Sequence, residues 1–240
     1  MAKLEWDKVG EHFYETGVDH TVLYLRDEAG KYTKGYAWSG VTSISESPSG
    51  AEASAQYADN QKYLTLISAE EFGMTIEAFT FPSEFDACNG EVEAAEGVRI
   101  GQQKRSTFGL SYRTKVGNDV EGQDKHYKLH LVYGCTASPS ERAYATVNES
   151  PEAMTFSWEV STNPENVAGK KPTSLITIDS READPTKLTQ LETMLYGGND
   201  TEPKLPSPDE VIALFSAGST GPGTGPGGET GAKSLEPSDH

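Results

Sequence analysis

The sequence has few cysteines and no long apolar run. Its two cysteines, Cys88 and Cys135, lie far apart and in no CxxC spacing, so we expect free thiols, with neither a disulfide nor a bound metal. No stretch approaches the roughly 18 apolar residues of a membrane span, and the segment 1–6 lacks the apolar core of a secretory signal. These absences predict a protein that is made and folded in the cytoplasm and does not contact a membrane.

Motifs that carry enzymatic chemistry are also missing. The sequence contains no GxSxG nucleophile elbow, no P-loop and no GxGxxG placed after a strand. His126 and His130 are four residues apart, but the run around them alternates like a strand, in which four residues span about 13 Å, so they cannot easily share one metal ion. His12 and His20 stand in no ligand pattern. We therefore expect no catalytic, metal-binding or cofactor-binding residue and no enzymatic activity.

Acidic residues outnumber cations, with 37 Asp and Glu against 20 Lys and Arg and a net charge of −17. Among so many acids chance pairs are expected, and we interpret the candidates for acid–base chemistry as a solvated face. These candidates are Asp59, Glu70, Glu71, Glu77 and Glu84. Affinity for phosphates needs clustered Lys and Arg, so the charge balance argues against nucleic-acid binding. An acidic surface serves solubility, or repels DNA that passes within about 8 Å at physiological salt.

Alternation of apolar and polar residues predicts strands up to about residue 178. The predicted strands are 21–26, 32–41, 63–67, 74–81, 108–115, 126–134, 143–147, 154–161 and 174–179. The first two form a hairpin, and 63–67 pairs with 74–81 across the connection 68–73, which could equally be a helical turn. The clearest alternation, over 154–161, is typical of a sandwich strand.

Aromatic residues occupy alternate positions in two of these strands. They are Tyr36, Trp38, Phe79 and Phe81. An exposed set could form a stacking platform for sugars or bases, but such positions more often pack a core or a seam between subunits, and we favour the latter.

Two capping signals predict helices after the last strand. Asp184 before Pro185, followed by leucines at helical spacing and by Gly197, predicts a helix over 185–196. The segment 207–210 repeats the signal and predicts a short helix over 208–216, with two acids in its first turn. Glycine and proline dominate from residue 217, so we expect one domain over 1–216 followed by a flexible tail over 217–240.

The segment 117–125 separates the strands 108–115 and 126–134 and is too long for a two-residue hairpin turn. It carries several acids among glycines, so we expect a projecting, solvated loop. A long acidic loop on a rigid hairpin suits contact with another subunit. The candidate contact residues are Asn118, Asp119, Glu121 and Asp124.

Several segments resemble one protein family in their residues. They are 50–60, 68–73, 75–85, 88–90, 101–119, 126–134 and 205–212. In combination they extend over about residues 4–216 and resemble the major tail protein of long-tailed (siphovirus-type) bacteriophages, which is the subunit of the tail tube. None of the segments carries a chemical mechanism, so the resemblance implies a role and no reaction.

The resemblance implies a β-sandwich of the tail-tube type with a flanking helix. It also implies a structural virion protein that assembles in the host cytoplasm into hexameric rings, which stack head to tail into the tail tube. The implied partners are other copies of the chain, a tape-measure protein, and tail terminator and distal tail proteins. Genomic DNA would pass through the lumen without specific binding, for which an acidic lining is suitable. The loop 117–125 and the N-terminal arm are then candidates for contacts between rings.

A competing interpretation is a β-sandwich module that binds glycans or mediates adhesion through aromatic and acidic residues. The missing secretory signal, the missing disulfide pattern and the lack of a clear calcium loop argue against it. Rings or tubes of the purified protein would favour the tail tube, whereas monomers that bind glycans would favour this alternative.

Overall fold

Strands dominate the structure, as the alternation predicts. The computed structural model describes residues 4–147 and 153–216, so the predicted tail over 217–240 lies outside the described residues. The described chain forms one large antiparallel sheet, three small ribbons and few helices, which confirms the mainly β, α+β class. Within these ranges, none of the helices has the length and apolar character needed to cross a membrane.

Strands come first along the chain, and the two longer helices come last. The strands are β1 (Tyr14–Arg26), β2 (Tyr32–Ala37), β3 (Val41–Glu46), β4 (Ser49–Gly50), β5 (Ala53–Ala58), β6 (Gln61–Ile67), β7 (Glu70–Glu71), β8 (Gly73–Ala78), β9 (Val92–Ala95), β10 (Val98–Ile100), β11 (Phe108–Asn118), β12 (Gly122–Ala137), β13 (Phe156–Thr162) and β14 (Leu175–Asp179). The helices are η1 (Ser83–Phe85), α1 (Asp86–Asn89), α2 (Pro185–Tyr196) and α3 (Pro208–Ser216).

The main sheet has eight strands in the order β2-β1-β11-β12-β13-β8-β3, with β14 also paired to β12. The long strand β12 divides the sheet, because its residues 128–132 pair with β14 and its residues 135–137 pair with β13. Gly134 lies at this fork with a φ of +64°, and a Cβ atom there would lie 2.1 Å from the carbonyl oxygen of Asn163. Only glycine fits this close backbone approach without strain.

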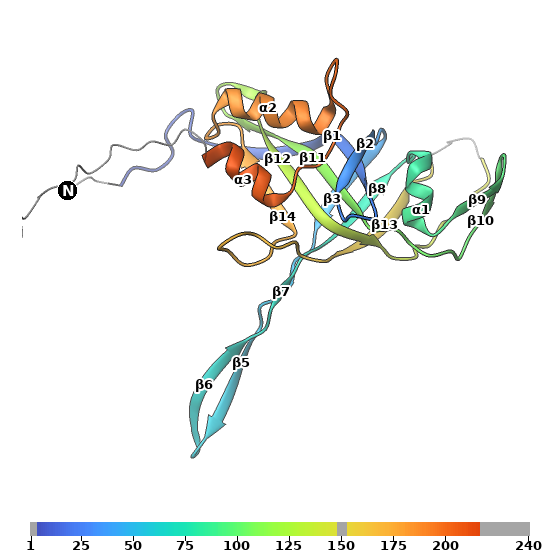
Figure 1. Ribbon diagram of the computed structural model, residues 1–240. Coiled ribbons are helices and arrows are strands. Elements are labelled where there is room, and N and C mark those ends of the chain that lie inside the picture. The colour runs from blue at the N-terminus through green and yellow to red at the C-terminus, as the bar shows by residue number, and fades with distance from the viewer. Residues whose placement is uncertain (1–3, 148–152, 217–240) are drawn as a thin grey trace, which may run out of the picture.

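The sheet curls so that β3 comes back beside β1, and its two halves face each other as the layers of a sandwich do (Figure 1). The core between the halves is apolar and includes Leu23, Ile76, Leu110, Val132 and Val160. Phe85 of η1 closes it. The ring of Phe85 contacts the rings of Trp38, Phe81, Phe108 and Trp158. Trp38 and Phe81 therefore pack the core, whereas Phe79 is half exposed.

Helices α2 and α3 cover the other face of the sheet (Figure 1). Asp184 accepts hydrogen bonds from the first-turn backbone of α2, and three leucines on one side of the helix pack on β12 residues. These leucines are Leu188, Leu191 and Leu195. Both helices begin and end at the predicted residues because their capping signals are local.

Three strand predictions need correction. Residues 63–67 do not pair with 74–81, because β6 pairs with β5 while β8 lies between β3 and β13. Residues 143–147 form no strand, and the connection predicted over 117–125 is only the turn 119–121. Alternation shows which side chains share a face, but it does not identify the partner strand or the length of the ladder.

Strands β3 to β8 form one long hairpin that runs out of the sheet. β3 pairs with β8, β4 with β7, and β5 with β6, so the connection 68–73 is extended chain and not a helical turn. Residues 49–71, which we call the arm, project far from the body of the protein (Figure 1). The root of the arm lies at the edge of the main sheet.

Candidate interaction surface

The arm is a two-stranded ribbon with solvent on both faces. All seven residues of β6 are exposed, and five of the six residues of β5 are exposed. The strands meet in a tight turn at Asp59 and Asn60, whose φ values of +51° and +59° are typical of a two-residue hairpin turn. An isolated two-stranded hairpin is only marginally stable in water, so a ribbon of this kind gains from a partner surface.

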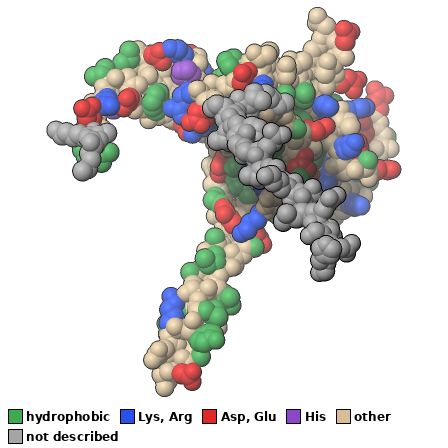
Figure 2. Space-filling model, turned by 60° about the vertical axis from the view of Figure 1, so that its left-hand side comes forward, with side chains coloured by type: hydrophobic (Ala, Val, Ile, Leu, Met, Phe, Trp, Pro, Cys, Tyr) green, Lys and Arg blue, Asp and Glu red, His purple; other side chains and the backbone are tan. Residues whose placement is uncertain are grey.

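The arm carries large apolar side chains that nothing in the described chain covers. Tyr63 is 74% exposed, and the other exposed apolar residues are Tyr57, Leu64, Leu66 and Ile67. Figure 2 shows these hydrophobic side chains along the arm, with few charged ones among them. Residues 53–67 contain one acid and one cation, although the whole chain has a net charge of −17. The outer part of the arm, residues 53–67, is therefore a neutral, apolar surface on a strongly acidic protein, as interaction sites often are.

A second exposed apolar patch lies at the N-terminal segment, far from the arm (Figures 1 and 2). This N-terminal patch consists of Leu4, Trp6, Val9, Phe13 and Val120. A groove of about 650 Å³ lies beside it, between the N-terminal segment and the β11–β12 turn. The guanidinium of Arg181 stacks over the Phe13 ring at 4.6 Å and holds it at the rim.

Two of the predicted contact residues hold the N-terminal segment on the β11–β12 turn. The Asn118 side chain donates to the carbonyl oxygen of Gly10 at 3.1 Å and accepts from two backbone groups of the turn. The Asp119 carboxylate accepts from the Gly10 backbone at 3.0 Å and lies 3.2 Å from His12. The bond from Gly10 lowers the pKa of Asp119.

The other two predicted contact residues also bind inside the chain. Glu121 forms an ion pair with Lys125, which lowers the pKa of Glu121, and Asp124 on β12 pairs with Lys115 at 2.7 Å. The structure thus brings Asn118, Asp119 and Glu121 together at one turn and places Asp124 beyond it. Their contact with another ring stays a prediction. All three residues of the turn 119–121 are exposed, and Val120 is the apolar one.

The sequence reasoning missed the arm. Its turn, Asp59-Asn60, is a local hairpin signal of the kind that could have identified it. The preceding strand, however, is rich in Ala and Ser and shows no alternation, so the pattern indicated no partner for 63–67. Exposure of Leu64 and Leu66 is a property of the tertiary structure, because the same residues would suit a buried strand.

Besides β2 and β3, which end the strand order, β1 and β14 leave open edges in the main sheet. The first half of β1, residues 14–19, pairs with β11 on one side, and β2 joins β1 only from Val22 onward. β14 pairs with β12 alone among the strands of the described chain. The four strands β1, β11, β12 and β14 therefore form a sheet portion with one unpaired edge at each side. Unpaired edges are templates for pairing with another chain.

Among the described residues, no group of three or more His, Cys, Asp or Glu side chains is placed to hold a metal ion. His130 is buried in the sheet, its ring stacked on Tyr112, whereas His126 lies near Glu121 at the rim. Both cysteines are buried thiols, and burial raises the pKa of Cys88 to about 12.

The sequence matches no protein-family model and no curated protein.

Proposed function

We propose that this protein is a tail tube subunit of a bacteriophage, a structural virion protein whose copies form hexameric rings that stack into a tube. The observation that supports the proposal best is the outer part of the arm, residues 53–67, an apolar ribbon that the described residues leave uncovered. Five large apolar side chains in water on one ribbon are a cost that contact with another copy removes. The resemblance of the residues to tail tube proteins points to the same role.

The positions of the two apolar surfaces favour an open-ended assembly. The arm and the N-terminal patch are unlike surfaces at different places on one molecule (Figure 1). When the arm of one copy contacts the N-terminal patch of another, the pair still has one unoccupied arm and one unoccupied patch. Further copies can therefore add at both ends. Stacked rings grow in this way, whereas a contact between like surfaces would stop at a dimer.

The open sheet edges support closure of each ring. The first half of β1 and the strand β14 lie at opposite sides of the four-strand portion, so one copy's β1 edge can pair with the next copy's β14 edge. Pairing around a ring would leave no such edge exposed, which protects a protein with a large sheet from aggregation.

The charge of the protein suits the passage of DNA. The face of the four-strand portion opposite α2 carries Lys128, whose ammonium group is bonded to Glu15 on β1. A paired cation is a weaker site for phosphate than a free one, and the net charge of −17 has the sign that repels DNA. In this role the protein works with a tape-measure protein and with tail terminator and distal tail proteins, and it resides in the virion tail.

Electron microscopy of the purified protein tests the proposal. We expect rings or tubes at micromolar concentration, and no assembly for the variant Leu64→Ser/Leu66→Ser, which removes apolar side chains from one face of the arm. Thr65→Ser on the other face is the matched control and should assemble normally. Both variants should unfold at the wild-type temperature, since the three residues are exposed.

A wild-type protein that stays monomeric in light scattering at all concentrations would contradict the proposal. If this monomer also binds immobilised glycans, the result would favour the adhesion module.

A further inference from the structure

The fold brings the two cysteines of the chain into the same part of the core, although they are far apart in the sequence. Cys88 lies in α1 and Cys135 on β12, and both side chains are fully buried in the cluster between the two halves of the sheet. The helix α1 contacts β12. Because the chain has no further cysteine, each thiol has only the other as a possible thiol partner within the protein.

The segment that leads into β11 connects the surroundings of the two thiols. The backbone N–H of Ser106 donates to the carbonyl oxygen of Ala87, the residue before Cys88, at 3.0 Å. Two residues later, Phe108 pairs with Cys135 in the sheet. This short segment therefore passes from the neighbour of one cysteine to the neighbour of the other, which places α1 at the Cys135 end of β12.

The side chain of Arg105 makes a second connection. Its Nη1 atom donates to the carbonyl oxygen of Cys88, at 3.5 Å, and to that of Ala137, at 3.0 Å. Ala137 and Cys135 occupy alternate positions of β12 and are both in the core cluster, so their side chains point to the same face. Burial raises the pKa of Cys135, and a negative charge on the nearby Cys88 would raise it further. The two thiols therefore lie on neighbouring elements, within reach of each other's charge.

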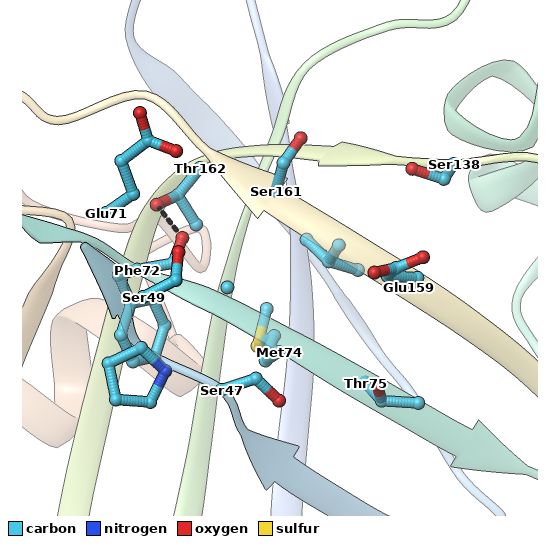
Figure 3. Close-up of a pocket in the computed structure, with 13 residues that line it drawn as sticks. Ser47, Ser49, Glu71, Phe72, Met74, Thr75, Ser138, Glu159, Ser161 and Thr162 are labelled. Carbon is cyan, nitrogen blue, oxygen red and sulfur yellow. Dashed lines mark hydrogen bonds between the residues drawn. The ribbon is translucent and has the colours of Figure 1, made fainter.

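A groove at the root of the arm brings solvent close to this pair of thiols. It has a volume of about 490 Å³, and Figure 3 shows Met74 on its floor and Ser161 and Thr162 on one wall. Met74 belongs to the same core cluster as the two thiols, and Thr162 pairs with Cys135 in the sheet. Neighbouring strands lie about 5 Å apart, so a small molecule in the groove at Thr162 is one strand away from Cys135.

Burial controls how these thiols react. It raises the pKa of Cys88 to about 12, and the thiolate is the form that attacks an oxidant, so oxidation in the folded protein is slow. The same burial shields a cysteine that has been oxidised from thiols in solution and in other copies. The neighbouring thiol is then the group that can react with it.

We propose that Cys88 and Cys135 form a disulfide bond when the protein meets a peroxide, and that this bond locks α1 onto β12. With hydrogen peroxide, one thiol is oxidised to a sulfenic acid and the first water molecule is released. The sulfur of the second thiol then displaces a second water molecule from the sulfenic acid, and the S–S bond forms. In sum, the two thiols lose two electrons and two protons, and one peroxide molecule becomes two water molecules. The crosslink goes beyond the proposed tail function and does not depend on it.

Treatment of the folded protein with hydrogen peroxide tests the disulfide. We expect the wild type to lose both free thiols over hours and to yield, in mass spectrometry without reduction, one linked pair of peptides that contains Cys88 and Cys135. Cys88→Ala and Cys135→Ala each leave one thiol and should yield no linked pair. A wild type that keeps both thiols, oxidises them to sulfinic acid or links two chains to each other would overturn the proposal.

Thermal unfolding tests whether the bond locks α1 in place. A disulfide that closes a long loop restricts the unfolded chain, so the oxidised wild type should melt roughly 5 °C or more above the reduced protein. Dithiothreitol should reverse the shift, and the same oxidation should not raise the melting temperature of Cys88→Ala. A disulfide that forms without raising the melting temperature of the wild type would overturn the lock.

Discussion

The hydroxyl group of Tyr112 donates a hydrogen bond of 2.6 Å to the carboxylate of Glu46. Tyr112 lies on β11, and Glu46 is the last residue of β3 before the chain enters the arm. The His130 ring stacks on Tyr112, and its Nδ1 atom lies 3.4 Å from the same carboxylate. This cluster joins the two halves of the curled sheet and holds the root of the arm in place.

Removing the hydroxyl group should measure the strength of this connection. Tyr112→Phe should lower the free energy of unfolding by about 1 to 2 kcal/mol, because a bond to a charged acceptor is lost while the half-exposed carboxylate of Glu46 can bind water instead. Denaturant unfolding gives the value. Tyr57→Phe on the exposed arm is the control and should change stability by less than about 0.5 kcal/mol. Equal effects of the two changes would show that the bond contributes nothing.

His130 should make the fold less stable in mild acid. Burial lowers its pKa, while the charge of Glu46 acts in the opposite direction. The unfolded chain therefore binds a proton at a higher pH than the folded one, and stability falls as the pH drops below about 6.5, the ordinary pKa of histidine. We expect the unfolding free energy of the wild type to decline more than that of His130→Gln between pH 7.5 and 5. If the unfolding free energies of the two proteins declined equally over this pH range, protonation of His130 would not be the cause.

Asn118 and Asp119 should hold the N-terminal segment. Asp119→Asn weakens the charge-assisted bond from the Gly10 backbone, and Asn118→Ala removes the bond to its carbonyl oxygen. Hydrogen exchange of the Gly10 amide should become about tenfold faster in each variant. Asp124→Asn, which loses a pairing with Lys115 instead, should leave that rate unchanged. If this control had the same effect, the N-terminal segment would not depend on these two bonds.

Gly134 should be intolerant of any side chain. Gly134→Ala combines a left-handed φ of +64° with a Cβ atom 2.1 Å from the backbone oxygen of Asn163, so we expect a loss of about 4 kcal/mol or a protein that does not fold. Gly169→Ala has a similar φ of +70° with no atom near its Cβ, and should cost only about 1 kcal/mol. Thermal unfolding of both variants distinguishes the free-energy cost of the Cβ clash from the cost of placing alanine in a left-handed backbone conformation. Similar melting temperatures would mean that β12 can move away from Asn163.

Local sequence patterns specify the features that depend on near neighbours. Asp184, Pro185 and the leucine spacing specify α2, because capping and helical periodicity act within a few residues. Alternation specifies which face of β13 is buried, since neighbouring side chains in a strand point in opposite directions. The mainly β class follows from these local patterns.

Strand partners, and the apolar residues that stay in water, are instead properties of the folded chain. Leu64 and Leu66 have the residue types of a core strand, yet β6 pairs with β5 beyond the edge of the sheet and meets no core. Asn118 and Asp119 lie in the segment predicted as a projecting loop, yet they bind Gly10, whose distance along the chain exceeds 100 residues. Local patterns cannot determine such relationships, because pairing and exposure depend on the packing of residues that are far apart in sequence.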